Sequence, residues 1–171
     1  ASVSTCSPPS IVMRYATFIF WNIAIILMSS TTAIGTRYVD AQLGWLTYQS
    51  YWSIGLGLLL ILIGLWLRYH STKHFHEHRV RVVQLSAQHH LITDGPFAWS
   101  RNPLILAITI IFLGATLVIG SMLGLVVVFG FQLFWHLWVM YYEEPSLQQQ
   151  FTSQYIDYCR RVPRWLPFPS L

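Results

Sequence analysis

The sequence predicts an all-α integral membrane protein with four transmembrane helices. Hydrophobic residues make up 54% of the 171 residues and charged residues only 9%, whereas soluble domains contain about 25% charged residues. So few charges cannot cover the surface of a soluble protein, but a bilayer accepts an apolar exterior. The eight tryptophans and nine tyrosines point the same way, because amphipathic rings collect at membrane interfaces.

Four apolar runs each come close to the roughly 20 residues that a helix needs to cross the hydrocarbon core. They cover about residues 11–34, 51–67, 103–119 and 122–140. Only Gly120 and Ser121 separate the last two runs, which predicts a tight antiparallel hairpin. A soluble bundle of buried helices is the alternative, and the shortage of polar faces to cover its exterior argues against it.

The basic residues lie almost entirely on one side of these runs. Between the first two runs there is only Arg37, and the hairpin turn has none. The other nine flank the opposite ends of the runs: Arg14, Arg68, Lys73, Arg79, Arg81, Arg101, Arg160, Arg161 and Arg164. This bias predicts that both termini and the middle loop face the cytoplasm, as in a bacterial inner-membrane protein. Since no dense basic patch forms, nucleic acid is excluded as a partner.

The segment after the fourth run predicts an amphipathic helix. Leu147, Phe151, Tyr155 and Tyr158 recur at spacings of four, four and three, which draws one apolar stripe on a helix. Pro145 suits a first-turn position. We expect this helix to lie on the membrane surface or to pack against the middle loop, and the prolines that follow end it.

Two polar segments at the cytoplasmic ends of the last two runs are the candidates for chemistry. The first, residues 89–103, reads HHLITDGPFAWSRNP; Asp94-Gly95-Pro96 is a turn signal, and Asn102-Pro103 begins a helix. Such a helix start offers free N–H groups to a carboxylate or a hydroxyl. The second is the Glu143-Glu144 pair, which can accept hydrogen bonds from hydroxyls or an ammonium. A plain loop and a solvated helix start are the structural alternatives.

These segments together resemble a known family. The patterns HxLxTxGPFxWxRNP and EEPxLxxxFxxxYxxYCRRVPRWLP, separated by an apolar hairpin, resemble the isoprenylcysteine carboxyl methyltransferases and their bacterial relatives. Membrane phospholipid N-methyltransferases share this C-terminal arrangement. The resemblance covers about residues 88–167. It implies a methyltransferase core over 88–171, preceded by the first two transmembrane helices and their loop over 1–87, in one structural unit.

The resemblance implies that S-adenosylmethionine is the cofactor, bound in a cytoplasm-facing pocket. The acceptor would be a lipid or another membrane-soluble molecule that carries an amine, a thiol or a carboxylate. Membrane lipids would be the partners, and no obligate protein partner is expected. An ammonium acceptor must first lose a proton, and Glu144 and His90 are the candidates to receive it. The implied cofactor contacts are His89, His90, Leu91, Ile92, Gly95, Phe97, Arg101, Asn102, Pro103, Leu104, Ile105, Glu143 and Glu144.

Three positions depart from the family pattern. Asn102 stands where family members often have histidine, and Thr152 replaces the glycine that usually follows the aromatic residue of the C-terminal helix. Val139 stands where the eukaryotic enzymes carry an arginine that meets the substrate carboxylate. This last departure argues against a prenylcysteine carboxylate as the acceptor.

Seven histidines raise a competing hypothesis. His70, His74, His76 and His78 precede His89-His90, and membrane di-iron desaturases and hydroxylases use histidine boxes near helix ends because imidazole is a good iron ligand. The chain contains the HxxxH spacing but lacks the further boxes of those enzymes, so we expect no metal ligands. A catalytically inactive membrane scaffold of the same fold is the third alternative.

Overall fold

The computed structural model describes residues 11–45, 48–77 and 91–166, with all of their side chains except those of 11–18 and 75–77. These residues form helices and no strand, which confirms the all-helical prediction. The elements are α1 (Ile11–Leu43), α2 (Tyr51–Glu77), the 3₁₀ helix η2 (Gly95–Ala98), α3 (Pro103–Ile119), α4 (Met122–Trp138), the π-helical turn η3 (Val139–Glu143) and α5 (Glu144–Arg161).

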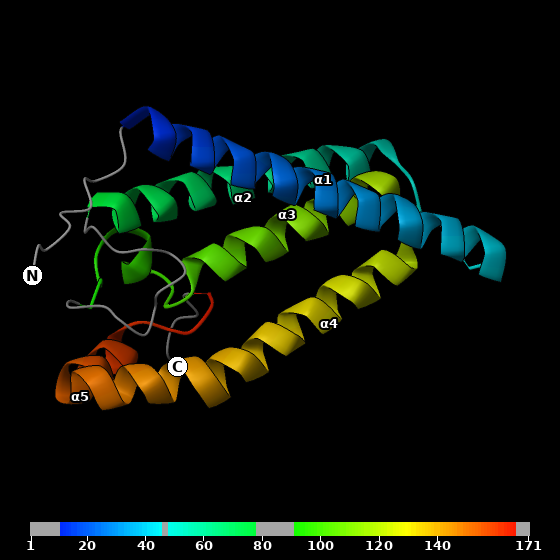
Figure 1. The fold of residues 1–171 in the computed structure, drawn as a ribbon. Coiled ribbons are helices and arrows are strands. Elements are labelled where there is room, and N and C mark those ends of the chain that lie inside the picture. The colour runs from blue at the N-terminus through cyan, green and yellow to red at the C-terminus, as the bar shows by residue number, and fades with distance from the viewer. Residues whose placement is uncertain (1–10, 46–47, 78–90, 167–171) are drawn as a thin grey trace, which may run out of the picture.

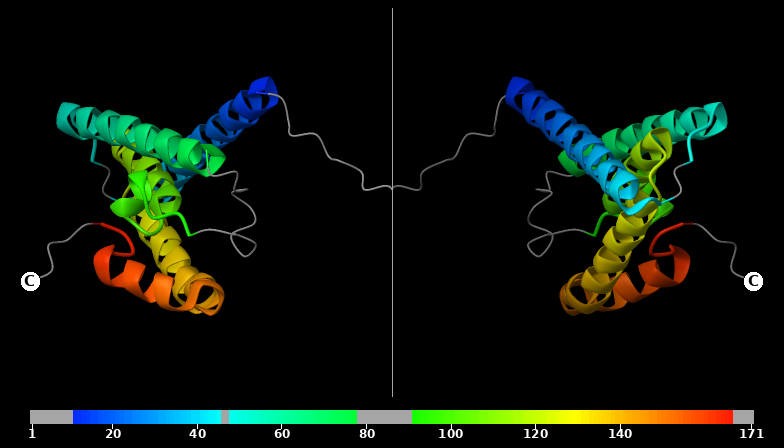
Figure 2. Two further views of the ribbon diagram at one scale, coloured as in Figure 1. Left: turned by 90° about the vertical axis from the view of Figure 1, so that its left-hand side faces the viewer. Right: turned by 90° about the vertical axis from the view of Figure 1, so that its right-hand side faces the viewer.

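The helices run back and forth between two ends of the molecule (Figure 1). One end holds the start of α1, the end of α2, η2, the start of α3 and α5; the α1–α2 connection and the α3–α4 turn lie at the other. Viewed from either end, α1 and α2 lie on one side of α3 and α5 lies on the other (Figure 2). After their common turn α4 diverges from α3, so the end of α4 and α5 lie apart from the body of α3 (Figure 1).

Three helical stretches are long and apolar enough to cross a membrane: Ile19–Leu43, Tyr51–His74 and Met122–Arg161, the last of which includes η3 and α5. Only 17% of the most apolar window of each is buried within the chain. Large apolar side chains such as Trp52, Leu62 and Phe129 are therefore exposed, which is the surface that lipid tails accept. The prediction of a membrane protein is confirmed. The apolar α3 is 17 residues long and falls short of that length.

Glycines set how closely α2 approaches α3. A Cβ on Gly57 would lie 2.6 Å from the carbonyl oxygen of Gly114, and a Cβ on Gly114 would lie 2.6 Å from that of Gly57. Small residues of this kind let membrane helices pack backbone to backbone. This contact holds the second half of α3 against the first half of α2, toward the end of the molecule that holds the α3–α4 turn.

A buried carboxylate organises the opposite end. Asp40 of α1 is fully buried, accepts a hydrogen bond of 2.6 Å from the Ser121 hydroxyl and accepts another of 3.1 Å from the backbone N–H of Leu123. The Ser121 hydroxyl in turn accepts from the N–H of Gly124. Two of the otherwise unsatisfied N–H groups at the start of α4 are thus capped, and the carboxylate ties α1 to the α3–α4 turn.

Helix starts were predicted better than helix ends. Tyr51, Pro103 and Met122 begin helices as expected. However, α1 continues past residue 34 to Leu43 and α2 past residue 67 to Glu77. Both extensions contain charged residues, among them Asp40 in α1 and Lys73 in α2, so the uninterrupted apolar runs of the sequence end before the helices do.

Helix α5 packs on the segment before α3 through the predicted apolar stripe. Tyr155, Tyr158 and Val162 form a buried cluster to which Leu91 and Leu147 add. The chain bends within this helix at Thr152, whose φ of 45° and ψ of −112° are not helical. The bend lets the second half of α5 turn back toward residues 91–102.

Replacing Thr152 with glycine should stabilise the protein by about 1 kcal/mol. A non-glycine residue at this positive φ is strained, and glycine adopts such a conformation freely. The Thr152 side chain is exposed, so little packing is lost. Unfolding followed in detergent micelles would measure the change. Ser153→Gly, at the neighbouring exposed position with ordinary helical dihedrals, should instead destabilise, and stabilisation by both changes would contradict the strain at Thr152.

Candidate functional site

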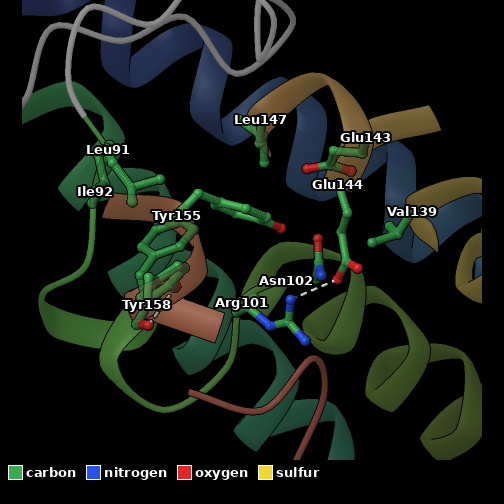
Figure 3. Close-up of a pocket in the computed structure, with 11 residues that line it drawn as sticks. Leu91, Ile92, Arg101, Asn102, Val139, Glu143, Glu144, Leu147, Tyr155 and Tyr158 are labelled. Atoms are coloured by element: carbon green, nitrogen blue, oxygen red, sulfur yellow. Dashed lines mark hydrogen bonds and ion pairs between the residues drawn. The ribbon is translucent and has the colours of Figure 1, made fainter. Parts of the chain in front are cut away.

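A pocket lies where the segment before α3, the end of α4 and the helix α5 meet (Figure 3). Side chains from all three contribute to its lining. They are Leu91, Ile92, Phe97, Arg101, Asn102, Val139, Glu143, Glu144, Leu147, Tyr155 and Tyr158. The pocket therefore joins the two polar segments that the sequence analysis selected, although about forty residues separate them along the chain.

The shape of the GPF segment depends on its glycine. Gly95 has a φ of +56° at the start of η2, and a Cβ at this position would overlap the imidazole of His74 at the end of α2. The backbone can approach His74 because glycine has no side chain. The 3₁₀ turn that follows buries Pro96 and Phe97 and directs the phenyl ring of Phe97 to the pocket wall.

Two arginines hold the carboxylate of Glu144. Arg101 donates from NH1 to Oε1 at 2.8 Å (Figure 3). Arg164 donates to both oxygens at 2.7 Å in the bidentate geometry that suits a guanidinium and a carboxylate. The side chains of Glu144, Arg101 and Arg164 are only 16%, 13% and 23% exposed, so these bonds are poorly screened. The hydrogen bonds to Glu144 raise the pKa of Arg164 above its usual value.

The C-terminal segment that follows α5 closes one side of the site. The N–H of Arg101 donates to the carbonyl of Pro163 at 3.0 Å, and the hydroxyl of Ser100 donates to the carbonyl of Arg164 at 3.1 Å. The Tyr158 hydroxyl donates to the carbonyl of Phe97 at 2.7 Å. The first two bonds join residues 161–165 (RVPRW) to residues 95–103 (GPF…RNP), so each segment supplies hydrogen-bond partners to the other.

Two polar side chains of the pocket have no such partners among the residues that the structure describes. Glu143 is half-buried, and no side chain in the described part of the protein bonds to its carboxylate. Asn102 is only 7% exposed and precedes α3, yet its amide makes no capping hydrogen bond. Buried polar groups are normally hydrogen-bonded. Because both line the pocket, an exogenous ligand is the natural partner for each.

The π-helical turn explains how two consecutive glutamates reach the same pocket. Its bonds run from residue i to i+5, which reduces the rotation per residue below that of an α-helix. The residues four and five positions after Val139 therefore both return to the face of Val139. In a regular α-helix Glu144 would turn away from that face. Such π-turns are often found at functional sites.

The structure brings together most, but not all, of the residues predicted to bind the cofactor. Seven of them line the pocket: Leu91, Ile92, Phe97, Arg101, Asn102, Glu143 and Glu144. Four others do not: Gly95 packs on His74, Leu104 packs on Ile92 and Phe97, and Pro103 and Ile105 are in the first turn of α3. His89 and His90 lie outside the described residues.

Sequence reasoning missed several residues of the site. Leu147, Tyr155 and Tyr158 line the pocket, although their periodicity indicated only an apolar helix face. In the sequence Arg164 contributes only to the charge bias that predicts the orientation in the membrane. The available clue was that Arg164 belongs to the same sequence pattern as the glutamate pair, and residues of one pattern often contact one another.

The histidines in the described part of the chain do not gather at one site. His70 bonds the carbonyl of Trp66 in its own helix, His74 lies at Gly95, and His136 of α4 pairs with Trp165. Among the described residues no group of three or more potential metal ligands occurs. His78 and the side chain of His76 lie outside this description.

Gly95→Ala should destabilise the protein by about 2 kcal/mol, because it combines a positive φ with an overlap on His74. It should also weaken binding in the pocket, since the GPF segment must move. Chemical unfolding in detergent measures the first effect. Gly130→Ala in α4 is the matched control, as a Cβ there meets nothing within 4 Å. Equal stability of the two variants would show that the contact with His74 is unimportant.

Comparison with known proteins gives two matches. The model of the phospholipid methyltransferase family matches residues 44–154, which include both sides of the pocket. The protein-S-isoprenylcysteine O-methyltransferase of Saccharomyces cerevisiae is 30% identical over 121 residues, which are 66% of this chain and 48% of that protein. The chain thus spans about half the length of this relative. The matches favour neither the di-iron nor the scaffold alternative. The chain belongs to the phospholipid methyltransferase family, and its resemblance to the isoprenylcysteine methyltransferases is confirmed.

Proposed function

We propose that this protein is an S-adenosylmethionine-dependent methyltransferase that acts on a lipid or another membrane-soluble acceptor. The observation that carries the proposal is a pair of polar side chains, Asn102 and Glu143, that have no side-chain hydrogen bond to any described residue and line a pocket with apolar walls. Ligand sites typically combine apolar walls with a few such polar groups. Family membership makes a methyl donor the expected ligand.

The residues of the pocket suit the chemistry of this cofactor. Glu143 can accept hydrogen bonds from ribose hydroxyls or from the ammonium group, and Asn102 can both donate and accept. Leu91, Ile92 and Phe97 provide an apolar wall for a purine ring. The cofactor, when bound, supplies an electrophilic methyl group on a sulfonium. The protein contributes by orienting the acceptor and excluding water, which needs no covalent intermediate.

We assign Glu144 a positioning role. Its two oxygens receive three hydrogen bonds from Arg101 and Arg164, so a proton from the acceptor would have to displace a guanidinium. The carboxylate instead connects the RNP segment, the start of α5 and the C-terminal segment. Of the two candidates for a proton acceptor, this geometry disfavours Glu144, and His90 stays a proposal.

The apolar side chain of Val139 in the pocket wall bears on which chemical group of the acceptor is methylated. Val139 is 1% exposed and lines the pocket, so no cation stands at this position to meet a carboxylate. We therefore favour an acceptor that reacts as an uncharged nucleophile or a thiolate: an amine that has lost its proton, or a thiol. Its hydrophobic part would reach the pocket from the bilayer.

We also propose that α3 crosses the membrane as a fourth span. Its 17 residues rise about 26 Å, close to the roughly 30 Å of the hydrocarbon core. The distribution of basic residues then supports a cytoplasmic pocket, with both ends of this chain on the same side of a bacterial inner membrane. Residues 88–171 would carry the cofactor site.

Isothermal titration of the full chain in detergent micelles with S-adenosylhomocysteine tests the proposed site. We expect binding with one site per chain, and Asn102→Ala should weaken it about tenfold through the loss of one or two hydrogen bonds. Thr109→Ala, a polar position on α3 outside the pocket lining, should leave the affinity unchanged. Absence of binding by the folded wild-type chain would contradict the proposal.

A further inference from the structure

A hydrogen bond determines which nitrogen of His136 carries a proton. Nε1–H of Trp165 points at Nδ1 of His136, at 3.1 Å. An indole nitrogen only donates, so Nδ1 must be an unprotonated acceptor. The proton of the neutral imidazole is then on Nε2. His136 therefore presents an N–H donor at the edge of its ring away from Trp165.

His136 lies on the face of α4 that leads to the pocket. One turn before it, Gln132 accepts a hydrogen bond of 2.7 Å from Thr109 of α3, and one turn after it, Val139 lines the pocket. Residues at these spacings share a helix face. Glu143 follows seven residues later, which is roughly 10 Å along the helix axis.

The faces of α4 beside that of His136 have the apolar surface that suits lipid rather than water. The neighbouring side chains of α4 on its other faces, Leu133, Phe134, Leu137 and Trp138, are apolar and exposed. His136 itself is half-buried, and its Nε2 has no partner among the residues that the structure describes. A polar group in an apolar setting is costly without a hydrogen-bond partner, and ionisable residues within membrane segments usually serve a function.

We infer that Nε2–H of His136 binds an oxygen of the lipid acceptor while the reactive group of that lipid lies in the pocket. His136 would then determine specificity for acceptors that carry a hydrogen-bond-accepting oxygen in the polar part of the lipid, apart from the methylated group. A phosphate and an ester carbonyl both offer such an oxygen, whereas a simple alkylamine does not. The inference rests on the proposed function and adds the recognition of the acceptor to it.

Binding of short-chain probes to the full chain saturated with S-adenosylhomocysteine tests this role. The probes are dihexanoyl phosphatidylethanolamine, its diether analogue, which lacks the ester carbonyls, and hexylamine. For the diacyl probe, His136→Phe should raise the Kd about tenfold, the effect of one lost hydrogen bond. His136→Gln keeps both an acceptor for Trp165 and an N–H donor and should bind nearly as the wild type. Hexylamine should bind equally to all three proteins.

The outcomes identify the oxygen that His136 binds, and they separate this inference from the proposed function. If the diether probe is as sensitive to His136→Phe as the diacyl probe, the phosphate is the partner; if it is insensitive, the ester carbonyl is. Equal binding of the diacyl probe by His136→Phe and the wild type would overturn the inference and leave the proposed function standing. So would an equal loss of hexylamine binding. Failure of the wild type to bind S-adenosylhomocysteine would overturn both.

Discussion

Replacing Glu144 with alanine should lower the free energy of unfolding by about 3 kcal/mol and abolish binding of S-adenosylhomocysteine. The substitution leaves Arg101 and Arg164 largely buried without a counter-charge. Removing one partner of a buried ion pair destabilises the folded state by more than the intact pair stabilises it, because the remaining charge stays buried and unpaired. The tie between the RNP segment, α5 and the C-terminal segment would also be broken. Unfolding in detergent and titration calorimetry on the same samples measure both effects.

Asp157→Ala is the matched control for this prediction. Asp157 lies on the same helix and pairs with Arg160 at 3.6 Å, but its side chain is 64% exposed. Exposed pairs contribute little, because water screens both charges. Stability and binding should therefore stay at their wild-type values. A Glu144→Ala protein as stable as the Asp157→Ala protein would contradict the role of Glu144 as the connecting carboxylate.

Glu143→Ala should separate binding from stability. No side chain of the described part of the protein bonds to the Glu143 carboxylate, so its removal should change the free energy of unfolding by less than about 0.5 kcal/mol, as for a typical substitution without a lost contact. The affinity for S-adenosylhomocysteine should fall ten- to hundredfold, the range of a hydrogen bond to a charged group. Calorimetric titration measures this change.

Glu143→Gln refines the test, because it keeps an oxygen acceptor without the charge. Its affinity should lie between those of the wild type and Glu143→Ala. Two results would contradict the division of roles between the glutamates. One is a loss of stability in Glu143→Ala as large as in Glu144→Ala, and the other is unchanged affinity in Glu143→Ala.

Much of the membrane architecture was predictable because it depends on local properties of the chain. Runs of apolar residues identify membrane helices, and Pro103 and Pro145 mark helix starts because proline fits the first turn. The apolar stripe of α5 was also visible, since periodicity needs no knowledge of the partner. What the stripe packs against, namely Leu91 and its neighbours, depends on tertiary structure.

The roles of the two glutamates were not predictable from their position in the sequence. Adjacent carboxylates at a helix start look equivalent, and the sequence does not reveal the π-turn that turns both toward one pocket. The partners of Glu144 come from residue 101 and residue 164, on either side of the glutamate pair. In the sequence Thr152 is only a departure from the family pattern and predicts no bend, whereas its positive φ in the structure gives a physical reason for glycine at this position.

Methyl transfer into membrane lipids tests the central claim most directly. The full chain in vesicles made from bacterial membrane lipids is incubated with S-adenosylmethionine that carries a deuterated methyl group, and the lipids are analysed by mass spectrometry. With S-adenosylmethionine at a concentration that half-saturates the wild type, we predict a lipid that gains the labelled methyl group with the wild-type chain and with Asp157→Ala, and much less labelling with Glu143→Ala. Labelling that is absent with the wild type, or equal in all three, would contradict the claim that this pocket is the site of a lipid methyltransferase.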